Sequence, residues 1–306
     1  MSLMIETDVE RGDFRQRECA QSPQRLIVAT FNIRYAVGQR LISGGLLRRL
    51  GLRRPRRRSS LVARNICLAA QAFSAGRHLP CPEVIALQEA DRGTKRAGGH
   101  HIAYELAQML GMCYVHAAQG LPRETAPRPK QWYLDFEESI AVDDDGDTGV
   151  ALLSRLPLLE VERIELPWFE CAWRPRVALA AQILMEGTPA FIFCVHIDPH
   201  AAIENRLVQH EKILAEAEER AGSRPIIIMG DFNTLSRRAC EETRDFLESR
   251  GYFSPQPTGT ATWRSGPIRL HTDWIFVRGL RVVRWGVARS IGKISDHWPV
   301  WAEVEL

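Results

Sequence analysis

Apolar and polar positions divide this chain into short apolar runs and longer segments of mixed character. A nearly continuous apolar run bounded by polar or turn residues predicts a buried strand. Such runs lie at residues 26–33, 84–88, 149–153, 177–185, 190–196, 225–229, 270–277, 280–285 and 299–304. We therefore expect a protein rich in buried strands.

Several segments of mixed character predict helices between these strands. In residues 202–222 apolar positions recur at helical spacing, which predicts a helix with one face on a core. The segment 60–76 offers Ser60 as an N-cap and Gly76 as a terminator. Further helices are expected at 99–111 and 237–251. Because the helices are interspersed among the strands, the pattern predicts an α/β or α+β arrangement.

The predicted elements form one domain over residues 25–306, since no segment between them has the composition of a linker. The polar residues 1–24 predict a flexible N-terminal tail. Two segments of one-sided charge interrupt the pattern, a basic insertion at about 36–59 and an acidic loop at about 122–148.

The basic insertion has two interpretations. Between Arg40 and Arg58 there are eight arginines and no acid. This is typical of a solvated, disordered segment. Alternatively, the arginines from Arg48 to Arg58 contact a polyanion, either a nucleic-acid backbone or an anionic lipid surface that also takes up the interleaved leucines. The acidic loop has seven acids from Asp135 to Asp147 but lacks the Gly and Glu that a calcium loop requires, so we expect it to be solvated.

Cysteine usage and the absence of apolar spans indicate a compartment. Seven cysteines are scattered without a Cys-x-x-Cys pair, which favours free thiols, and Cys67 and Cys194 lie in apolar stretches that should bury them. The N-terminal residues lack the basic and apolar regions of a signal peptide, and no apolar run could span a bilayer. We expect a soluble, cytoplasmic monomer.

Polar side chains suited to a metal ion or a phosphate close most of the predicted strands. Carboxylate and amide oxygens are the ligands that Mg²⁺ and Mn²⁺ prefer. One such strand end would mean little, but six in one chain are hard to obtain from packing alone, so we expect a shared site. The residues are Asn32, Glu89, His196, Asp198, Asp231, Asn233, Asp273, Asp296 and His297.

Most of these residues belong to short motifs that follow one another along the chain. The motifs are Thr30-Phe-Asn-Ile-Arg34, Leu87-Gln-Glu89, Gly149-Val-Ala-Leu-Leu-Ser154, Arg176, Val195-His-Ile-Asp198, Gly230-Asp-Phe-Asn233, Thr272-Asp-Trp-Ile-Phe276 and Ser295-Asp-His-Trp-Pro299. In this set and order the chain, from about Leu26 to Leu306, resembles the endonuclease/exonuclease/phosphatase superfamily. That superfamily includes deoxyribonuclease I, apurinic endonucleases, neutral sphingomyelinases and inositol-polyphosphate 5-phosphatases.

The resemblance implies a fold and a reaction. The fold would be a four-layer α/β sandwich, in which two mixed β-sheets pack face to face between outer helices and strand ends meet at one edge. The reaction would be hydrolysis of a phosphoester by in-line attack of water, with Mg²⁺ or Mn²⁺ as the cofactor. Glu89 would be the principal metal ligand, with Asn32 and Asp296 in the same metal shell.

The resemblance also implies how the reaction is divided among the remaining side chains. Asp231 would orient or deprotonate the attacking water, and Asn233 would hold that water or a phosphoryl oxygen. His297, oriented by Asp273, would bind the scissile phosphate. His196 would assist the leaving oxygen from the other side.

Two residues near the site and the identity of the substrate stay open. Arg176 matches a phosphate-contacting arginine of many bacterial members of the family. Asp198 would either contact metal or substrate or lie in a solvated loop. A phosphodiesterase or nuclease is favoured, with a lipid or small-molecule phosphoesterase as the alternative and an inactive phosphate-binding relative as a second alternative.

Overall fold

The computed structural model describes residues 9–15, 23–39, 55–120, 140–141, 143–169 and 174–306. Residues 40–54 and 121–139 fall outside these ranges, and with them most of the predicted basic insertion and acidic loop. Of the arginines from Arg48 to Arg58 that are expected to contact a polyanion, the first four lie outside the described residues and the last three lie in the described range that begins at 55.

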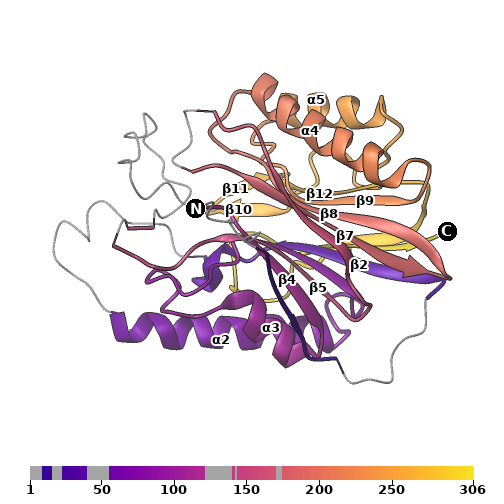
Figure 1. Cartoon of the computed structure of the whole chain (residues 1–306). Helices are drawn as coiled ribbons and strands as arrows, with labels where there is room; N and C mark the ends of the chain where they lie inside the picture. Colours follow the sequence, from indigo (N-terminus) through magenta and orange to yellow (C-terminus); the bar gives the residue numbers. More distant parts are fainter. Residues whose placement is uncertain (1–8, 16–22, 40–54, 121–139, 142, 170–173) are drawn as a thin grey trace, which may run out of the picture.

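Two β-sheets form the centre of the protein (Figure 1). The seven-stranded sheet has the order β1 (Val9–Asp13), β4 (Cys113–Ala118), β5 (Gly149–Ser154), β3 (Val84–Gln88), β2 (Arg25–Asn32), β14 (Val300–Glu305) and β13 (Arg281–Val287). The five-stranded sheet has the order β12 (Asp273–Arg278), β9 (Ile226–Asp231), β8 (Thr188–His196), β7 (Val177–Met185) and β6 (Leu159–Glu165). A separate hairpin pairs β10 (Trp263–Ser265) with β11 (Ile268–Leu270).

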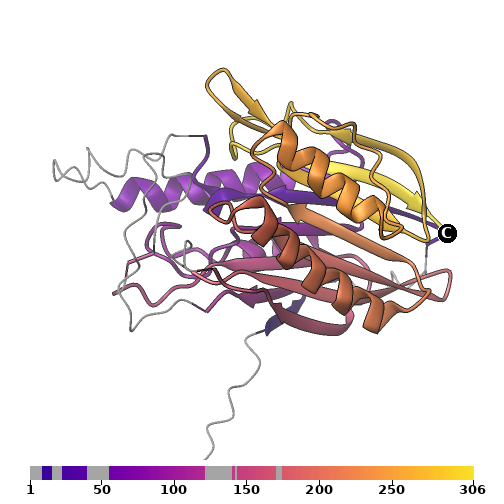
Figure 2. The same cartoon turned by 90° about the horizontal axis from the view of Figure 1, so that it is seen from above.

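Helices cover the outer face of each sheet, so the molecule has four layers. α2 (Pro55–Ser74) and α3 (Ile102–Leu110) pack on the seven-stranded sheet, and α4 (Ile203–Ala221) and α5 (Arg237–Glu248) pack on the five-stranded sheet. Figure 2 shows α4 and α5 side by side over the strands. A third apolar core lies between the two sheets. The predicted α/β sandwich is confirmed.

The directions of the strands explain why functional residues meet at one edge. β2 runs parallel to β3 and β8 runs parallel to β9, so the carboxyl ends of each pair lie together. β14 is antiparallel to β2 and β12 is antiparallel to β9, so the amino ends of β14 and β12 reach the same edge. The sandwich thus presents six strand ends, three from each sheet, at one side.

Gly230 permits β8 and β9 to approach closely at this edge. A Cβ atom on Gly230 would lie 1.9 Å from the carbonyl oxygen of Val195. A larger residue would therefore push the two strands apart. Because His196 and Asp231 are the next partners in the register, this glycine helps to set the distance between them.

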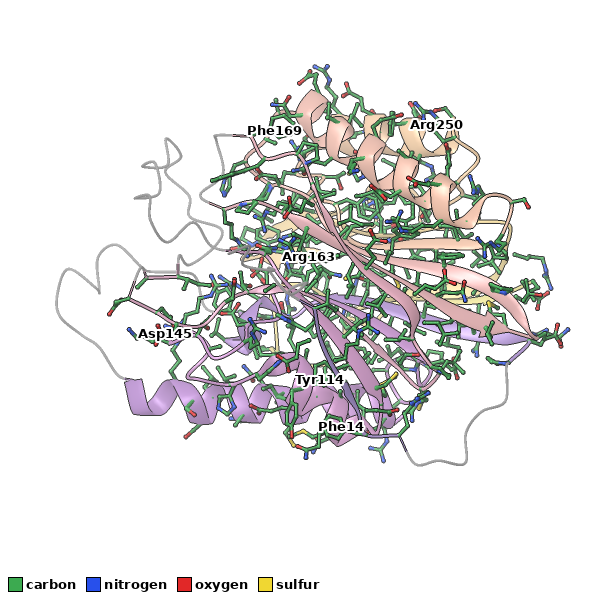
Figure 3. All side chains as sticks on the ribbon, viewed as in Figure 1. Phe14, Tyr114, Asp145, Arg163, Phe169 and Arg250 are labelled. Carbon is green, nitrogen blue, oxygen red and sulfur yellow. The ribbon has the colours of Figure 1, made fainter. Side chains whose placement is uncertain are left out.

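The N-terminal segment differs from the tail expected at residues 1–24. Val9–Asp13 forms strand β1, which pairs with β4 at the edge of the sheet, and Phe14 stacks on Tyr114 with ring centroids 6.2 Å apart (Figure 3). The prediction of a tail is wrong for these residues. A half-exposed edge strand carries polar residues, so it leaves no apolar run in the sequence.

Two element boundaries also differ from expectation. α2 begins at Pro55 and not near Ser60, because proline suits a first helical turn in which its missing N–H needs no partner. The basic insertion is correspondingly shorter than the predicted 36–59. The strand expected at 270–277 is divided, since β11 ends at Leu270 and β12 begins at Asp273.

The described part of the acidic loop is solvated only in part, since Asp143 and Asp145 are exposed as expected but their neighbour is not. Asp144 is buried and accepts hydrogen bonds from the backbone N–H groups of Lys95 at 2.8 Å and Gly146 at 3.1 Å. Among the described cysteines, which are all free, Cys194 is buried as expected but Cys67 is exposed on α2. In the described ranges no helix is both long and apolar enough to cross a membrane.

Candidate active site

A pocket opens where the six strand ends meet. Its walls come from both sheets and from the β10–β11 hairpin. Six of the ten residues predicted for the site line this pocket, and four others lie behind or beside them. The lining residues are Arg34, Glu89, His196, Pro199, Asp231, Asn233, Leu235, Trp263, Leu270, Thr272, Asp296 and His297.

Asn32, at the end of β2, connects two acids that come from different sheets. Its Nδ2 donates to Glu89 Oε1 at 3.2 Å and to Asp231 Oδ2 at 2.9 Å. Its Oδ1 accepts from the backbone N–H of Arg34 at 3.0 Å, and a flipped amide would place two donors against each other. The amide nitrogen of Asn32 therefore holds Glu89 and Asp231 side by side.

Glu89 follows β3 in an unusual backbone conformation, with a left-handed φ of +52°. Its Oε1 is held by Asn32, whereas its Oε2 is buried and has no hydrogen-bond partner among the described residues. A buried carboxylate oxygen without a partner is unfavourable unless a cation or another ligand satisfies it. Glu89 is therefore placed as a ligand would be.

His297 and Asp273 form a buried hydrogen-bonded pair. His297 Nδ1 lies 2.9 Å from Asp273 Oδ2, and Thr272 Oγ1 donates to the same oxygen at 2.7 Å. Burial opposes a charged imidazole, but the negative charges of Asp273 and Asp231 outweigh it and raise the pKa of His297 to about 10. His297 is an imidazolium at neutral pH, and its Nε2 lies 3.8 Å from Asp231 Oδ2.

His196 occupies the opposite side of the same carboxylate. Its Nε2 lies 3.8 Å from Asp231 Oδ2 and 3.9 Å from Glu89 Oε1. The guanidinium of Arg176 donates to His196 Nδ1 at 3.3 Å. Burial, reinforced by the positive charges of Arg176 and Arg174, holds the pKa of His196 well below its usual value. His196 is therefore a neutral imidazole.

Asp231 lies between the two histidines. Burial and the charge of Asp273 raise the pKa of Asp231 to about 7, although His297 and the hydrogen bond from Asn32 act in the opposite direction. A carboxylate with this pKa can accept a proton near neutral pH.

Asn233 follows Asp231 with a left-handed φ of +50° and donates through Nδ2 to the carbonyl of Ile197 at 2.7 Å. Its side-chain oxygen is left to accept a hydrogen bond in the pocket.

Two of the residues around Asp296 had no role assigned from the sequence. Arg34 Nη1 lies 3.2 Å from Asp296 Oδ2, and Trp263 Nε1 donates to the same oxygen at 3.0 Å. Arg34 is part of the first quoted motif, but its position depends on a left-handed backbone at residues 34–36 that periodicity does not reveal. Trp263 belongs to a three-residue strand that is too short to give a pattern.

Arg176 and Asp198 lie beside the pocket. Arg176 reaches the site through His196 and does not line the pocket itself. Asp198 is fully buried and accepts a hydrogen bond from the backbone N–H of His200 at 2.8 Å, so the solvated-loop alternative is wrong. Its charge faces Arg176 and Arg206.

A family model for the Endonuclease/Exonuclease/phosphatase family matches residues 29–297, which include every residue of the pocket. The chain belongs to this family. The resemblance seen in the ordered motifs is thereby confirmed. Members of the endonuclease/exonuclease/phosphatase family are hydrolases that act on phosphoester bonds, generally with a divalent metal ion. No curated protein matches the sequence.

Solved structures of endonuclease/exonuclease/phosphatase proteins share the fold. One from Bacteroides vulgatus has 19% identity and a TM-score of 0.63 over 92% of this chain and 99% of its own. ANGEL2, a 2′,3′-cyclic phosphatase in complex with adenosine-2′,3′-vanadate, has 16% identity and a TM-score of 0.61 over 92% and 96%. TDP2 from D. rerio, complexed with a single-strand DNA product, has 16% identity and a TM-score of 0.57 over 92% and 99%.

The donor atoms of the site fit the divalent metal ion of the endonuclease/exonuclease/phosphatase family. Glu89 offers an oxygen without a partner, and Asp231 offers a second carboxylate beside it. Ligand atoms of Asp231, Asp273 and His297 also lie within 4.8 Å of one another. Because Asp273 and His297 already satisfy each other, the carboxylates that remain to bind a cation are Glu89 and Asp231.

Proposed function

We propose that this protein is a Mg²⁺- or Mn²⁺-dependent phosphodiesterase. The observation that carries the proposal is the orphaned oxygen of Glu89, held in one pocket with Asp231, the charged imidazole of His297 and the neutral imidazole of His196. Hard divalent cations prefer such oxygen donors. An imidazolium and a neutral imidazole on either side of a carboxylate suit an anionic substrate and a proton transfer.

The metal ion, when bound, supplies Lewis-acid polarisation of the phosphate. Glu89 would hold it, and Asn32 orients Glu89 through its amide nitrogen. Asp296 lies on the same side of the pocket, with Arg34 and Trp263 fixing its carboxylate. In this arrangement Asn32 positions the metal ligand Glu89 and does not itself bind the metal ion.

The side chains of the five-stranded sheet handle the water and its proton. Asp231, with a pKa of about 7, accepts a proton from the attacking water, which the side-chain oxygen of Asn233 helps to orient. His297 donates from Nε2 to a phosphoryl oxygen, and Asp273 keeps it charged. His196, oriented by Arg176, lies opposite and donates a hydrogen bond from Nε2 to the leaving oxygen, which takes its proton from solvent.

We infer that the substrate is a phosphodiester and favour a nucleic acid. Two proteins of the same fold support this choice, since one was captured with single-strand DNA product and the other with a nucleoside vanadate. Fold alone does not determine what is attached to the phosphate, so lipid and small-molecule phosphoesters remain the competing substrates.

An activity panel tests the proposal. Purified protein is assayed with Mg²⁺, Mn²⁺ or Zn²⁺ on bis(4-nitrophenyl) phosphate, 4-nitrophenyl phosphate, labelled DNA and RNA, and sphingomyelin vesicles. We expect cleavage of the diesters with Mg²⁺ or Mn²⁺, loss with EDTA, and restoration when either metal is added back. The Glu89→Gln variant is the matched control for a contaminating enzyme. Activity that persists in EDTA, or a preference for the monoester, would overturn the proposal.

A further inference from the structure

Three arginines surround the side chain of Trp298, the residue that follows His297. The guanidinium carbon of Arg264 lies 4.7 Å from the centroid of the indole, that of Arg289 lies 5.7 Å away and that of Arg269 lies 5.8 Å away. Arg264 comes from β10, Arg269 from β11, and Arg289 from the segment after β13. We call Arg264, Arg269 and Arg289 the arginine triad.

The triad lacks the acids that neutralise other arginines of this protein. Arg264 and Arg269 are directly opposed in the register of the hairpin, and like charges in that position destabilise a strand pair. Among the described residues, none of the three forms an ion pair, although Arg269 and Arg289 donate to backbone carbonyls. The Nε of Arg264 is buried without a hydrogen-bond partner in the same part of the chain.

A second arginine–tryptophan contact shows what the triad is missing. Arg284 lies over Trp301 at 5.6 Å and is paired with Glu303. The arginines of α5 likewise pair with glutamates one turn later. Burial and the neighbouring charge of Arg269 lower the pKa of Arg264, and the charge of Asp296 opposes them only in part.

The hairpin that carries two members of the triad also forms a wall of the catalytic pocket. Trp263 and Leu270 line that pocket, and each is the chain neighbour of a triad arginine. The backbone N–H of Arg264 donates to the carbonyl of Asp296 at 2.9 Å. Arg264 and Arg269 thus lie directly beside residues that line the pocket.

We propose that the arginine triad binds a phosphate that flanks the scissile one on a nucleic-acid strand. This assignment rests on the proposed function of the pocket. Guanidinium groups bind phosphate oxygens in a bidentate manner, and the face of Trp298 holds them in place. A substrate with a single phosphate would leave the triad unused. Arg269 and Arg289 are exposed, so the site is an open surface past which an extended strand can run, and not an enclosed pocket for a small polyphosphate.

Equilibrium binding tests the triad without requiring turnover. A fluorescein-labelled single-stranded DNA is titrated into the Glu89→Gln protein, with and without Gln at all three triad positions, over a range of salt concentrations. We expect the dissociation constant to rise at least about tenfold and the slope of log affinity against log salt to fall by about 2, since each contact with a single strand contributes about 0.7.

A matched variant controls for net charge. It carries Gln at three arginines that already have glutamate partners, namely Arg250, Arg281 and Arg284. This variant should keep the original salt slope. If the two triple variants weaken binding equally, or if neither does, the triad is not a phosphate site. The double variant at the exposed Arg269 and Arg289 gives the same test if the variant at Arg264 does not fold.

Cleavage separates this proposal from the function of the pocket. In the triad variant that retains Glu89, the ratio of kcat/KM for the oligonucleotide to that for bis(4-nitrophenyl) phosphate should fall at least about fivefold, mainly through KM for the oligonucleotide. Equal losses of kcat/KM on both substrates would overturn the assignment of the triad as a phosphate site. The assignment would also fail if the protein bound inositol hexakisphosphate through the triad more tightly than it binds DNA. A wild-type protein that cleaves no phosphodiester, yet binds DNA through the triad, would overturn the proposed function alone.

Discussion

His196 and His297 face the same oxygen of Asp231 at the same distance of 3.8 Å, yet His297 is charged and His196 is neutral. The difference lies in the partner of the other ring nitrogen. His297 Nδ1 contacts the carboxylate of Asp273 at 2.9 Å, whereas His196 Nδ1 accepts from the guanidinium of Arg176 at 3.3 Å. A contact one step removed from the pocket therefore decides which imidazole is charged.

The largest loss of activity is expected when the carboxylate that both histidines face is removed. Asp231→Asn should lower kcat by about a thousandfold at saturating metal, because it removes the group that accepts the proton of the attacking water. Glu89→Gln should have a similar effect, because it removes the metal ligand and with it the stabilisation of charge on the phosphate. Stopped assays on bis(4-nitrophenyl) phosphate measure this loss. Thermal unfolding of Asp231→Asn should stay cooperative but at a lower temperature, since an amide nitrogen replaces one of the two oxygens that accept from Asn32 Nδ2 and from the backbone N–H of Asn233. Activity close to that of the wild type would refute the site.

Removing the partner of His297 should make it behave more like His196. Asp273→Asn should lower the pKa of His297 from about 10 and reduce kcat between about tenfold and a hundredfold, most strongly as pH rises from 6 to 9, where the imidazolium is lost. His297→Ala combined with Asp273→Asn should be little worse than His297→Ala alone, because the carboxylate acts through the imidazole. Losses that multiply would show that the two residues act independently.

The converse change sharpens the comparison. Arg176→Gln removes a positive neighbour, so the pKa of His196 should rise toward its usual value. NMR titration of the metal-free protein follows the imidazole directly. We expect a reduction in kcat of about threefold to tenfold that is larger at pH 6 than at pH 8, because a protonated His196 adds a charge beside the metal site. If the pKa of His196 is the same in the variant as in the wild type, Arg176 does not control the charge of His196.

The smallest effect concerns stability away from the pocket. Burial lowers the pKa of His210 to about 3 and that of His116 to about 4, so both contribute stability that is present above pH 6.5 and lost as pH falls below it. His297 acts in the opposite sense, since its contribution is complete below pH 6.5 and is lost as pH rises through about 10. In metal-free protein His210→Gln should reduce the loss between pH 6.5 and 5.5 by about 1 kcal/mol. If denaturant unfolding gives the same loss of unfolding free energy between pH 6.5 and 5.5 for the wild type and the variant, the prediction is wrong.

The sequence is informative about this site because buried strands cannot accommodate polar residues without a reason. Asn32, Asp231 and His196 each end an apolar run, so both the strands and the residues they present could be predicted. The partners of these residues come from distant parts of the chain. The contact of Arg34 with Asp296, and that of Trp263 with the same acid, depend on tertiary packing that no local pattern records.

Three strands of the two sheets escaped prediction, namely the buried β4 and the edge strands β1 and β6, and the two edge strands share a physical cause. β1 and β6 are edge strands whose side chains are partly exposed, so their sequences contain polar residues at most positions. The charge of each histidine could not be predicted either, because it depends on whether a carboxylate or a guanidinium approaches the ring from another strand.

At Glu89 the requirements of catalysis and of backbone stability conflict. Its left-handed backbone is one that an L-residue with a side chain adopts at a penalty of about 1 kcal/mol and that glycine adopts freely. A random replacement by glycine would therefore relax the chain while abolishing the ligand. A Glu89→Gly variant would thus couple a gain in backbone stability to the loss of the metal ligand.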